Sequence, residues 1–273
     1  MKVLAHVSDP HFGTEDRAVH DALLADLDGH TGSTPALILV SGDLTQRART
    51  EQFRAARQFL DQLTAPYLVV PGNHDVPLYD LVSRFHHPLR KYKQHITDDL
   101  MPTFLDDDVA VVGLTTPHGW TVKSGKITAE QVRAAAAWFE GAGDRIRIVV
   151  AHHPFSLPDG RSPSDLVEGA AMARPILEAA GVTLICTGHL HLAFSTDTVG
   201  FRSEDREIVN IHAGTCMSTR VRGEPQGYNR LKLDGDSLTL QTRIWNQQRF
   251  VDGPMKLYRR SHGRWRKDAE QAA

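Results

Sequence analysis

The chain has only two cysteines, Cys186 and Cys216, among its 273 residues, which excludes a disulfide framework and gives no reason to expect an oxidising compartment. No apolar run approaches the ~18 residues that a membrane-spanning helix needs. The N-terminus enters a strand-like run, Val3 to Val7, without a signal-peptide core before it. These absences predict a soluble cytoplasmic protein with no membrane partner.

An excess of one charge is also lacking, since 31 Lys+Arg face 33 Asp+Glu for a formal net charge of -2. Duplex nucleic acid favours a broad basic face, so nucleic acid is a disfavoured partner. The local exception is a basic C-terminal tail, made up of Arg259, Arg260, Arg264, Arg266 and Lys267. We interpret it as a solvated terminus rather than a polyanion contact, although the second interpretation stays open.

No stretch rich in Pro, Gly or Ser divides the chain, and 41% hydrophobic residues are enough for one large core. We therefore predict a single domain over residues 1–273, with a cap-like insertion at 77–108 and a C-terminal extension at 246–273. The insertion is less regular than its surroundings and contains His86, His87 and His95. It is interpreted as a helical cap or a lid.

Short apolar runs alternate with segments of helical periodicity. We expect strands at 2–8, 36–40, 67–70, 109–114, 146–150 and 182–186, and helices within 17–27, 53–63, 128–139 and 172–179. This alternation predicts a mainly parallel sheet with both faces covered. Strands at 208–212, 228–233 and 237–245 then predict a second, more antiparallel sheet. The fold class is α/β, a four-layer α/β/β/α sandwich of two mixed sheets flanked by helices, with the functional site at the carboxyl ends of the strands.

Fifteen histidines are many for this length, and several lie in five clusters at predicted strand ends. The clusters are Asp9-x-His11, Gly42-Asp43, Gly72-Asn73-His74-Asp75, His152-His153-Pro154 and Gly188-His189-x-His191. Any one of them is explained by a turn or a surface residue. Together they supply carboxylates, imidazoles and one carboxamide, which suit Zn, Mn or Fe, whereas Ca and Mg prefer oxygen-only sites. No cysteine accompanies them, which argues against a structural zinc site.

The five clusters resemble the signature blocks of the calcineurin-like metallophosphoesterases, in that family's order and over about two thirds of the chain. Length and spacing most resemble the bacterial branch of cyclic-nucleotide and glycerophosphodiester phosphodiesterases. The resemblance implies two divalent or trivalent metal ions (Mn, Fe or Zn), and a homodimer by analogy alone. It implies that one ion takes Asp9, His11 and His191, that the other takes Asn73, His152 and His189, and that Asp43 bridges them.

The resemblance also implies that His74 faces the substrate instead of binding metal. We hypothesise that His74, as an imidazolium, stabilises the transition state or protonates the leaving oxygen. Asp75 either holds the His74 ring or is a turn residue, and both interpretations stay open. Of the adjacent pair, His152 matches the ligand that the resemblance implies because it stands two residues before Pro154, and His153 is the fallback, for which a supporting or packing role is favoured. For three more residues, His212, Arg220 and Arg222, a place at the substrate pocket is left open.

The combined prediction is a binuclear-metal phosphodiesterase that hydrolyses small phosphodiesters, 3′,5′-cyclic nucleotides among them, by attack of a metal-bound hydroxide. The alternatives are a nuclease on the same scaffold, a phosphomonoesterase or nucleotide pyrophosphatase, and a non-catalytic metal-binding scaffold. The neutral charge and the lack of an aromatic-basic stripe disfavour the nuclease. The scaffold interpretation is disfavoured because no expected ligand, nor His74, is missing.

Overall fold

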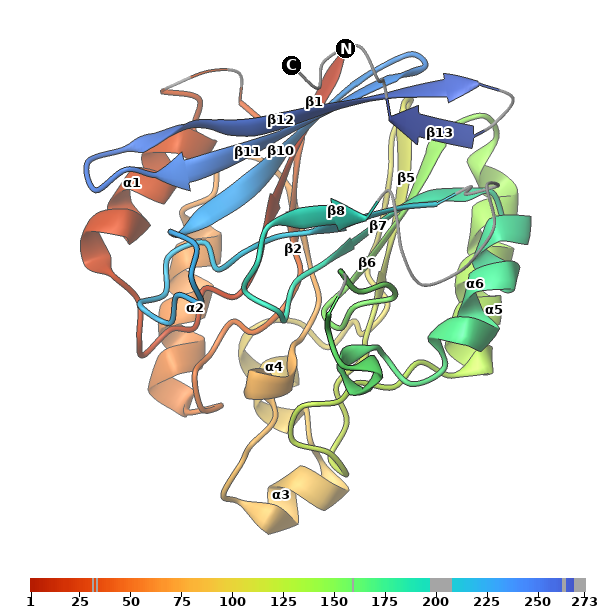
Figure 1. Ribbon diagram of the computed structural model, residues 1–273. Coiled ribbons are helices and arrows are strands. Elements are labelled where there is room, and N and C mark those ends of the chain that lie inside the picture. The colour runs from red at the N-terminus through yellow and green to blue at the C-terminus, as the bar shows by residue number, and fades with distance from the viewer. Residues whose placement is uncertain (31, 33, 159, 197–207, 262–263, 268–273) are drawn as a thin grey trace.

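The computed structural model describes residues 1–273 except 31, 33, 159, 197–207, 262–263 and 268–273 (Figure 1). Its helices are α1 (Arg17–Leu27), α2 (Thr50–Asp61), α3 (Leu81–His86), α4 (Arg90–His95), α5 (Ala129–Phe139) and α6 (Ala170–Ala179). The strands of the first half are β1 (Lys2–Val7), β2 (Leu37–Val40), β3 (Tyr67–Val69), β4 (Thr103–Leu105), β5 (Val109–Leu114) and β6 (Ile146–Ala151). The later strands are β7 (Val182–Thr187), β8 (Phe194–Thr196), β9 (Val209–His212), β10 (Gly227–Asp234), β11 (Ser237–Trp245), β12 (Phe250–Ser261) and β13 (Arg264–Lys267).

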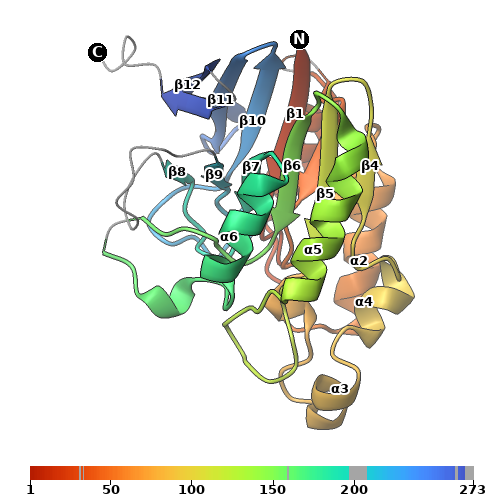
Figure 2. The ribbon, with the colours of Figure 1, turned by 90° about the vertical axis from the view of Figure 1, so that its right-hand side faces the viewer.

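Two sheets form the centre of the molecule, and helices cover their outer faces (Figures 1 and 2). One sheet has the order β13-β12-β11-β10-β1-β2-β3, and the other has the order β4-β5-β6-β7-β9-β8. Helices α1 and α2 lie on the first sheet, whereas α5 and α6 lie on the second. This arrangement confirms the predicted α/β/β/α sandwich of two mixed sheets.

The strands are divided between the sheets differently from the sequence expectation. The late antiparallel strands do not form a sheet of their own, because β10 pairs antiparallel with β1 and so extends the first sheet. The second sheet is instead built on the parallel run β5-β6-β7-β9. Strand order depends on pairing between segments far apart in the chain, which apolar periodicity does not encode.

The apolar core has three layers, one between the two sheets and one between each sheet and its helices, and alternate side chains of a strand enter different layers. In β1, Ala5 and Val7 face α1 and α2, whereas Leu4 faces the other sheet. The same alternation places Ile38 and Val40 of β2 outward and its leucines inward. Strands buried on both faces read as continuous apolar runs, which is why the sequence identified them.

The insertion 77–108 contains α3, α4 and β4 and is attached to a neighbouring loop. The buried guanidinium of Arg84 on α3 donates hydrogen bonds to the carbonyl oxygens of Pro77, at 2.9 Å, and of Thr121. At the other end of the chain, residues 250–267 form β12 and β13 (residues 262–263 excepted), which continue the first sheet. The predicted domain division stays a prediction. No helix of the described ranges combines the length and apolar character needed to cross a membrane.

Candidate metal centre

The carboxyl ends of five parallel strands meet at one edge of the two sheets. Asp9 follows β1, Asp43 follows β2 and Asn73 follows β3, while His152 and His189 follow β6 and β7 of the second sheet. Backbone hydrogen bonds join neighbouring ends, from Asp9 N to Gly42 O at 3.1 Å and from Gly188 N to His152 O at 3.1 Å. The sandwich therefore brings together side chains that are up to 182 positions apart in the sequence.

Several of these residues adopt a backbone conformation that L-residues rarely use. Positive φ angles occur at seven non-glycine residues of the described chain, and five of them are predicted ligands. They are Asp9, His11, Asp43, His189 and His191, with φ between 49° and 72°. Such conformations cost of order 1 kcal/mol each and cluster at functional sites. The protein thus holds these side chains in place against local backbone preference.

One group of ligand atoms surrounds the Oδ1 atom of Asp9. His191 Nε2 lies 3.2 Å and His11 Nε2 lies 3.5 Å from this oxygen. His11 Nε2 is also 3.1 Å from His191 Nε2 and 3.6 Å from Asp43 Oδ2. These four side chains are buried and present their lone pairs to a common point.

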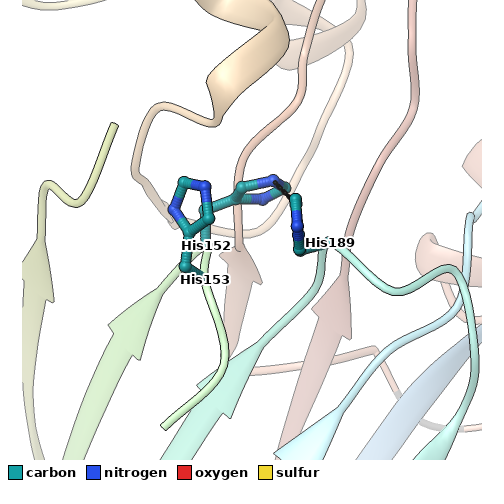
Figure 3. A group of neighbouring side chains, drawn as sticks. All are labelled: His152, His153 and His189. Atoms are coloured by element: carbon teal, nitrogen blue, oxygen red, sulfur yellow. Dashed lines mark hydrogen bonds between the residues drawn. The ribbon is translucent and has the colours of Figure 1, made fainter. Parts of the chain in front are cut away.

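A second group lies on the other side of Asp43. His152 Nε2 is 3.4 Å from Asp43 Oδ1, 3.1 Å from Asn73 Oδ1 and 3.3 Å from His189 Nδ1. His189 Nδ1 is in turn 3.0 Å from Asn73 Oδ1. Figure 3 shows the His152 and His189 rings turned toward each other. Asp43 therefore contributes one carboxylate oxygen to each group.

Both groups fit a metal ion. With ligand bonds of about 2.0–2.2 Å, adjacent ligand atoms lie about 2.8–3.6 Å apart in tetrahedral or octahedral coordination. The distances in both groups fall in this range. Asp9 Oδ1 is buried and accepts no hydrogen bond in the structure, so a cation is the partner that would satisfy it.

Hydrogen bonds from the outer atoms of three predicted ligands orient them. The Nδ1 atoms of His152 and His191 lie 2.8 and 2.9 Å from the carbonyl oxygens of Ser41 and Arg220. The Asn73 amide donates to the Val122 carbonyl at 3.2 Å, which turns its Oδ1 toward the two imidazoles. Such contacts fix the tautomer that leaves the inward nitrogen free to bind metal.

The carboxylates make this pocket strongly attractive to positive charge. Burial by itself would raise the pKa of Asp43, but the His152 and His74 imidazoles beside it hold this pKa well below its usual range. Burial lowers the pKa of His152, yet the charge of Asp43 outweighs it and raises the value to about 9. The pocket thus draws in a proton or a metal cation.

His74 lies beside this centre without joining either group. Its backbone N–H donates to Asp43 Oδ1 at 2.8 Å, and its Nδ1 lies 2.8 Å from the Gln46 carbonyl oxygen. Asp75 does not hold the His74 ring, since its carboxylate accepts the backbone N–H groups of Leu44, Thr45 and Gly72. Asp75 therefore joins the loop after β2 to the loop after β3, which resolves the open alternative in favour of a structural role.

A cavity of about 260 Å³ opens over the centre and includes Asp43, Asn73, His74, His189 and His191. Arg220 and Arg222, which the sequence left open, both line it. His212 does not: it is buried, and its Nδ1 lies 2.7 Å from Thr187 Oγ1. The core interpretation of His212 is therefore the correct one.

Comparison with known proteins identifies the family. Residues 2–193, well over half of the chain, match the family model described as calcineurin-like phosphoesterase. The chain belongs to this family. The resemblance predicted from the five clusters is confirmed, and the protein is a metal-dependent phosphoester hydrolase.

Two curated relatives of this phosphoesterase are phosphodiesterases. A glycerophosphodiester phosphodiesterase from Enterobacter lignolyticus is 27% identical over 208 residues, which cover 69% of this chain and 70% of the relative. A cAMP/cGMP dual specificity phosphodiesterase from Mycobacterium tuberculosis is 27% identical over 262 residues, covering 86% and 77%. Both belong to the branch that the sequence suggested.

Solved structures with the same fold have much lower identity. A dimetal phosphatase from Danio rerio has a TM-score of 0.65 and 14% identity, over 92% of this chain and 98% of that chain. A structure of PhoD has a TM-score of 0.69 and 12% identity, over 97% of this chain and 71% of that chain. These similarities show the shared fold of the phosphoesterase.

His153 lies close enough to His152 and His189 to suggest a third ligand (Figure 3). Its ring nitrogens are already engaged, because Nε2 lies 2.9 Å from the Lys123 carbonyl oxygen and Nδ1 lies 2.7 Å from Thr116 Oγ1. A carbonyl only accepts, so Nε2 donates to it, and Nδ1 accepts from the threonine. No lone pair is left for a metal, which supports the interpretation of His153 as a supporting residue.

The two adjacent histidines should therefore respond differently to substitution. We expect His152→Ala to lose one metal per chain, because it removes an imidazole from the second group. His153→Gln keeps a side chain that can bond Thr116 or Lys123 and should retain both metals. Metal content by elemental analysis checks this prediction, with wild-type protein as reference. Equal metal loss in both variants would contradict the assignment.

The structure explains two glycines of the predicted clusters and adds site features that gave no signal in the sequence. A Cβ atom on Gly72 would collide with Asp43, and one on Gly188 would collide with Ser8, so the close approach of these neighbours requires glycine at both positions. The Gln46 carbonyl, which holds the His74 ring, is a backbone group that any residue supplies. Arg47 and Arg161 also line the cavity from loops without a recognisable motif.

Proposed function

We propose that this phosphoesterase is a binuclear-metal phosphodiesterase that hydrolyses small phosphodiesters, with cyclic nucleotides and glycerophosphodiesters as the leading candidates. The observation that carries the proposal is that Asp43 lies between two groups of ligand atoms, with one carboxylate oxygen near His11 and the other near His152. In this proposal Asp9, His11 and His191 hold one cation, and Asn73, His152 and His189 hold the other. Mn, Fe and Zn suit this mixture of oxygen and nitrogen ligands.

The residues of the chain position the reaction. Two cations in such a site supply an acidified water and neutralise the charge of the phosphate. Asp43, held by the backbone N–H of His74, sets the separation of the two ligand groups. His74 lies on the cavity side of the centre, where its ring can reach a bound ester.

Cavity size and relatives both favour a small diester. The cavity of about 260 Å³ is close to the lower end of the ~300–1,000 Å³ typical of small-molecule sites. The two curated relatives described above are named for phosphodiester substrates. The nuclease alternative relied on the basic C-terminal tail, part of which is β13. Helix α3 contributes Arg84 to the cavity. Strand β13 lies at the opposite end of the molecule from α3 (Figure 1). That position supports a small substrate.

A metal-depleted preparation tests the proposal. We expect no hydrolysis of bis(p-nitrophenyl) phosphate without metal, and recovery on addition of Mn, Fe or Zn ions but not of Ca ions. The diester should be cleaved with a higher kcat/KM than p-nitrophenyl phosphate, because the proposal assigns a diester preference. A protein that binds two metals yet hydrolyses neither compound would instead be a non-catalytic scaffold. Faster cleavage of the monoester would favour the phosphomonoesterase.

A further inference from the structure

Among the described residues, five arginines line the cavity that includes His74, and Arg47, Arg220 and Arg222 are three of them. Across the part of the chain that the structure describes, none of the three forms an ion pair with a carboxylate. Arg220 is half-buried, whereas Arg47 and Arg222 are exposed. Unpaired guanidinium groups gathered around one cavity point to an anionic ligand.

Arg220 is held in the cavity wall by contacts with the site. Its Nη1 lies 3.1 Å from Gln46 Oε1 and 3.3 Å from His74 Nε2, and its backbone carbonyl accepts from the predicted ligand His191. It comes 27 positions after residue 193, where the family match ends. The three-dimensional fold therefore adds this cation to the family site from a segment outside the matched region.

Arg47 is also held in position. Its guanidinium lies over the Tyr79 ring, 5.5 Å from the ring centre, and donates to the Tyr79 hydroxyl at 3.2 Å. Burial lowers the pKa of Arg220, and the charges of Arg222 and Arg47 lower it further against the opposing effect of Asp43 and Asp9, so both of these guanidiniums lie close enough to repel that of Arg220. An anion between them would convert this repulsion into attraction.

One diester phosphate does not account for so much positive charge. A phosphodiester carries a single negative charge, and two divalent cations beside the two buried carboxylates, Asp9 and Asp43, still leave enough positive charge to offset it. Three further guanidiniums offer planar, forked donors that match phosphate oxygens, and guanidinium–phosphate contacts are among the stronger hydrogen bonds.

We propose that Arg47, Arg220 and Arg222 form a subsite for a second phosphate group of the substrate, one that is not cleaved. The inference rests on the proposed phosphodiesterase function and narrows it to diesters that carry a further phosphate. Recognition then combines the metal centre, which takes the scissile phosphate, with the arginine subsite, which takes the terminal one.

Two chromogenic esters that differ by one phosphate test the subsite. They are the p-nitrophenyl ester of thymidine 5′-phosphate and the same ester with an added 3′-phosphate. We expect the 3′-phosphate to lower KM roughly 10- to 100-fold in the wild-type protein, from one or more charge-assisted hydrogen bonds. Arg47→Ala and Arg222→Ala should each remove much of this gain and leave the KM of the simpler ester unchanged within about threefold.

The matched control is Arg54→Ala, which removes an exposed arginine from α2 outside the cavity and should keep the full gain. Arg220→Lys keeps the positive charge but loses the forked guanidinium donors. We therefore expect the 3′-phosphate to lower KM in this variant by less than in the wild type but more than in an alanine variant. If the 3′-phosphate gives no advantage, the subsite is overturned. The subsite is also overturned if Arg47→Ala and Arg222→Ala have no effect and Arg220→Ala raises the KM of both esters equally. Arg220 would then bind the scissile phosphate.

Binding without turnover separates this inference from the proposed function. Calorimetric titration with thymidine 3′,5′-bisphosphate and with thymidine 5′-phosphate should show tighter binding of the bisphosphate, by the same factor that Arg222→Ala removes. This preference would support the subsite even if no diester were hydrolysed, an outcome that would refute only the phosphodiesterase proposal. Hydrolysis of diesters with equal affinity for both ligands would refute only the subsite.

Discussion

Asp43→Asn should reduce kcat/KM for a phosphodiester by at least about 10³-fold and lower the metal content. Asp43 faces both ligand groups, with Oδ2 3.6 Å from His11 Nε2 and Oδ1 3.4 Å from His152 Nε2. Asparagine has the same shape but no negative charge and only one oxygen, so it cannot join two cations. The decrease in kcat/KM and in metal content therefore reports how much the bridging carboxylate and its negative charge contribute.

Asparagine is the informative substitution because the backbone of residue 43 has a φ of 52°. Asparagine tolerates this left-handed conformation better than most residues, so the fold should survive. Its Oδ1 can still accept from the backbone N–H of His74. Elemental analysis, kcat/KM and the melting temperature are measured together, and Asp107→Asn on the surface serves as control. Two retained metals with near wild-type activity would refute the bridging role.

His74→Ala should lower kcat by about 10²- to 10⁴-fold while both metals remain bound. The structure adds a condition to the hypothesis of an imidazolium. Nδ1 lies 2.8 Å from the Gln46 carbonyl and Nε2 lies 3.3 Å from the Arg220 guanidinium, which can only donate. These two contacts favour a neutral His74, in line with a pKa that is lowered by burial despite the opposing charge of Asp43. Protonation of Nε2 requires Arg220 to turn away from it, for example toward a bound phosphate.

The leaving group distinguishes a general acid from a purely electrostatic role. p-Nitrophenolate departs without a proton near neutral pH, whereas an alkoxide needs one. A general acid at position 74 therefore predicts a larger kcat loss for a glycerophosphodiester than for bis(p-nitrophenyl) phosphate. The same acid predicts that activity falls as pH rises through its pKa in wild type but not in His74→Ala. His86→Ala, an exposed histidine outside the cavity, is the control. Full retention of kcat would remove His74 from the reaction.

The sequence alone determined the strands and helices that lead into the site and the residues at their ends, but it did not predict β4, β8, β12 and β13. Continuous apolar runs such as Leu37–Val40 identified strands, and Thr128 with Gln131 identified a helix start that the structure confirms as a capping box. Polar clusters directly after these runs identified the residues that the structure brings together. This worked because the carboxyl ends of parallel strands meet at one edge whatever the strand order is.

Only the tertiary structure decided which groups share a partner. The pairing of β1 with β10, the oxygen of Asp43 that faces each ligand group, and the two hydrogen bonds that occupy His153 all depend on contacts between distant segments. The approach of Arg220 to His74 spans 146 positions. Such contacts leave no local pattern, because they depend on how whole layers pack and not on the spacing of neighbouring residues.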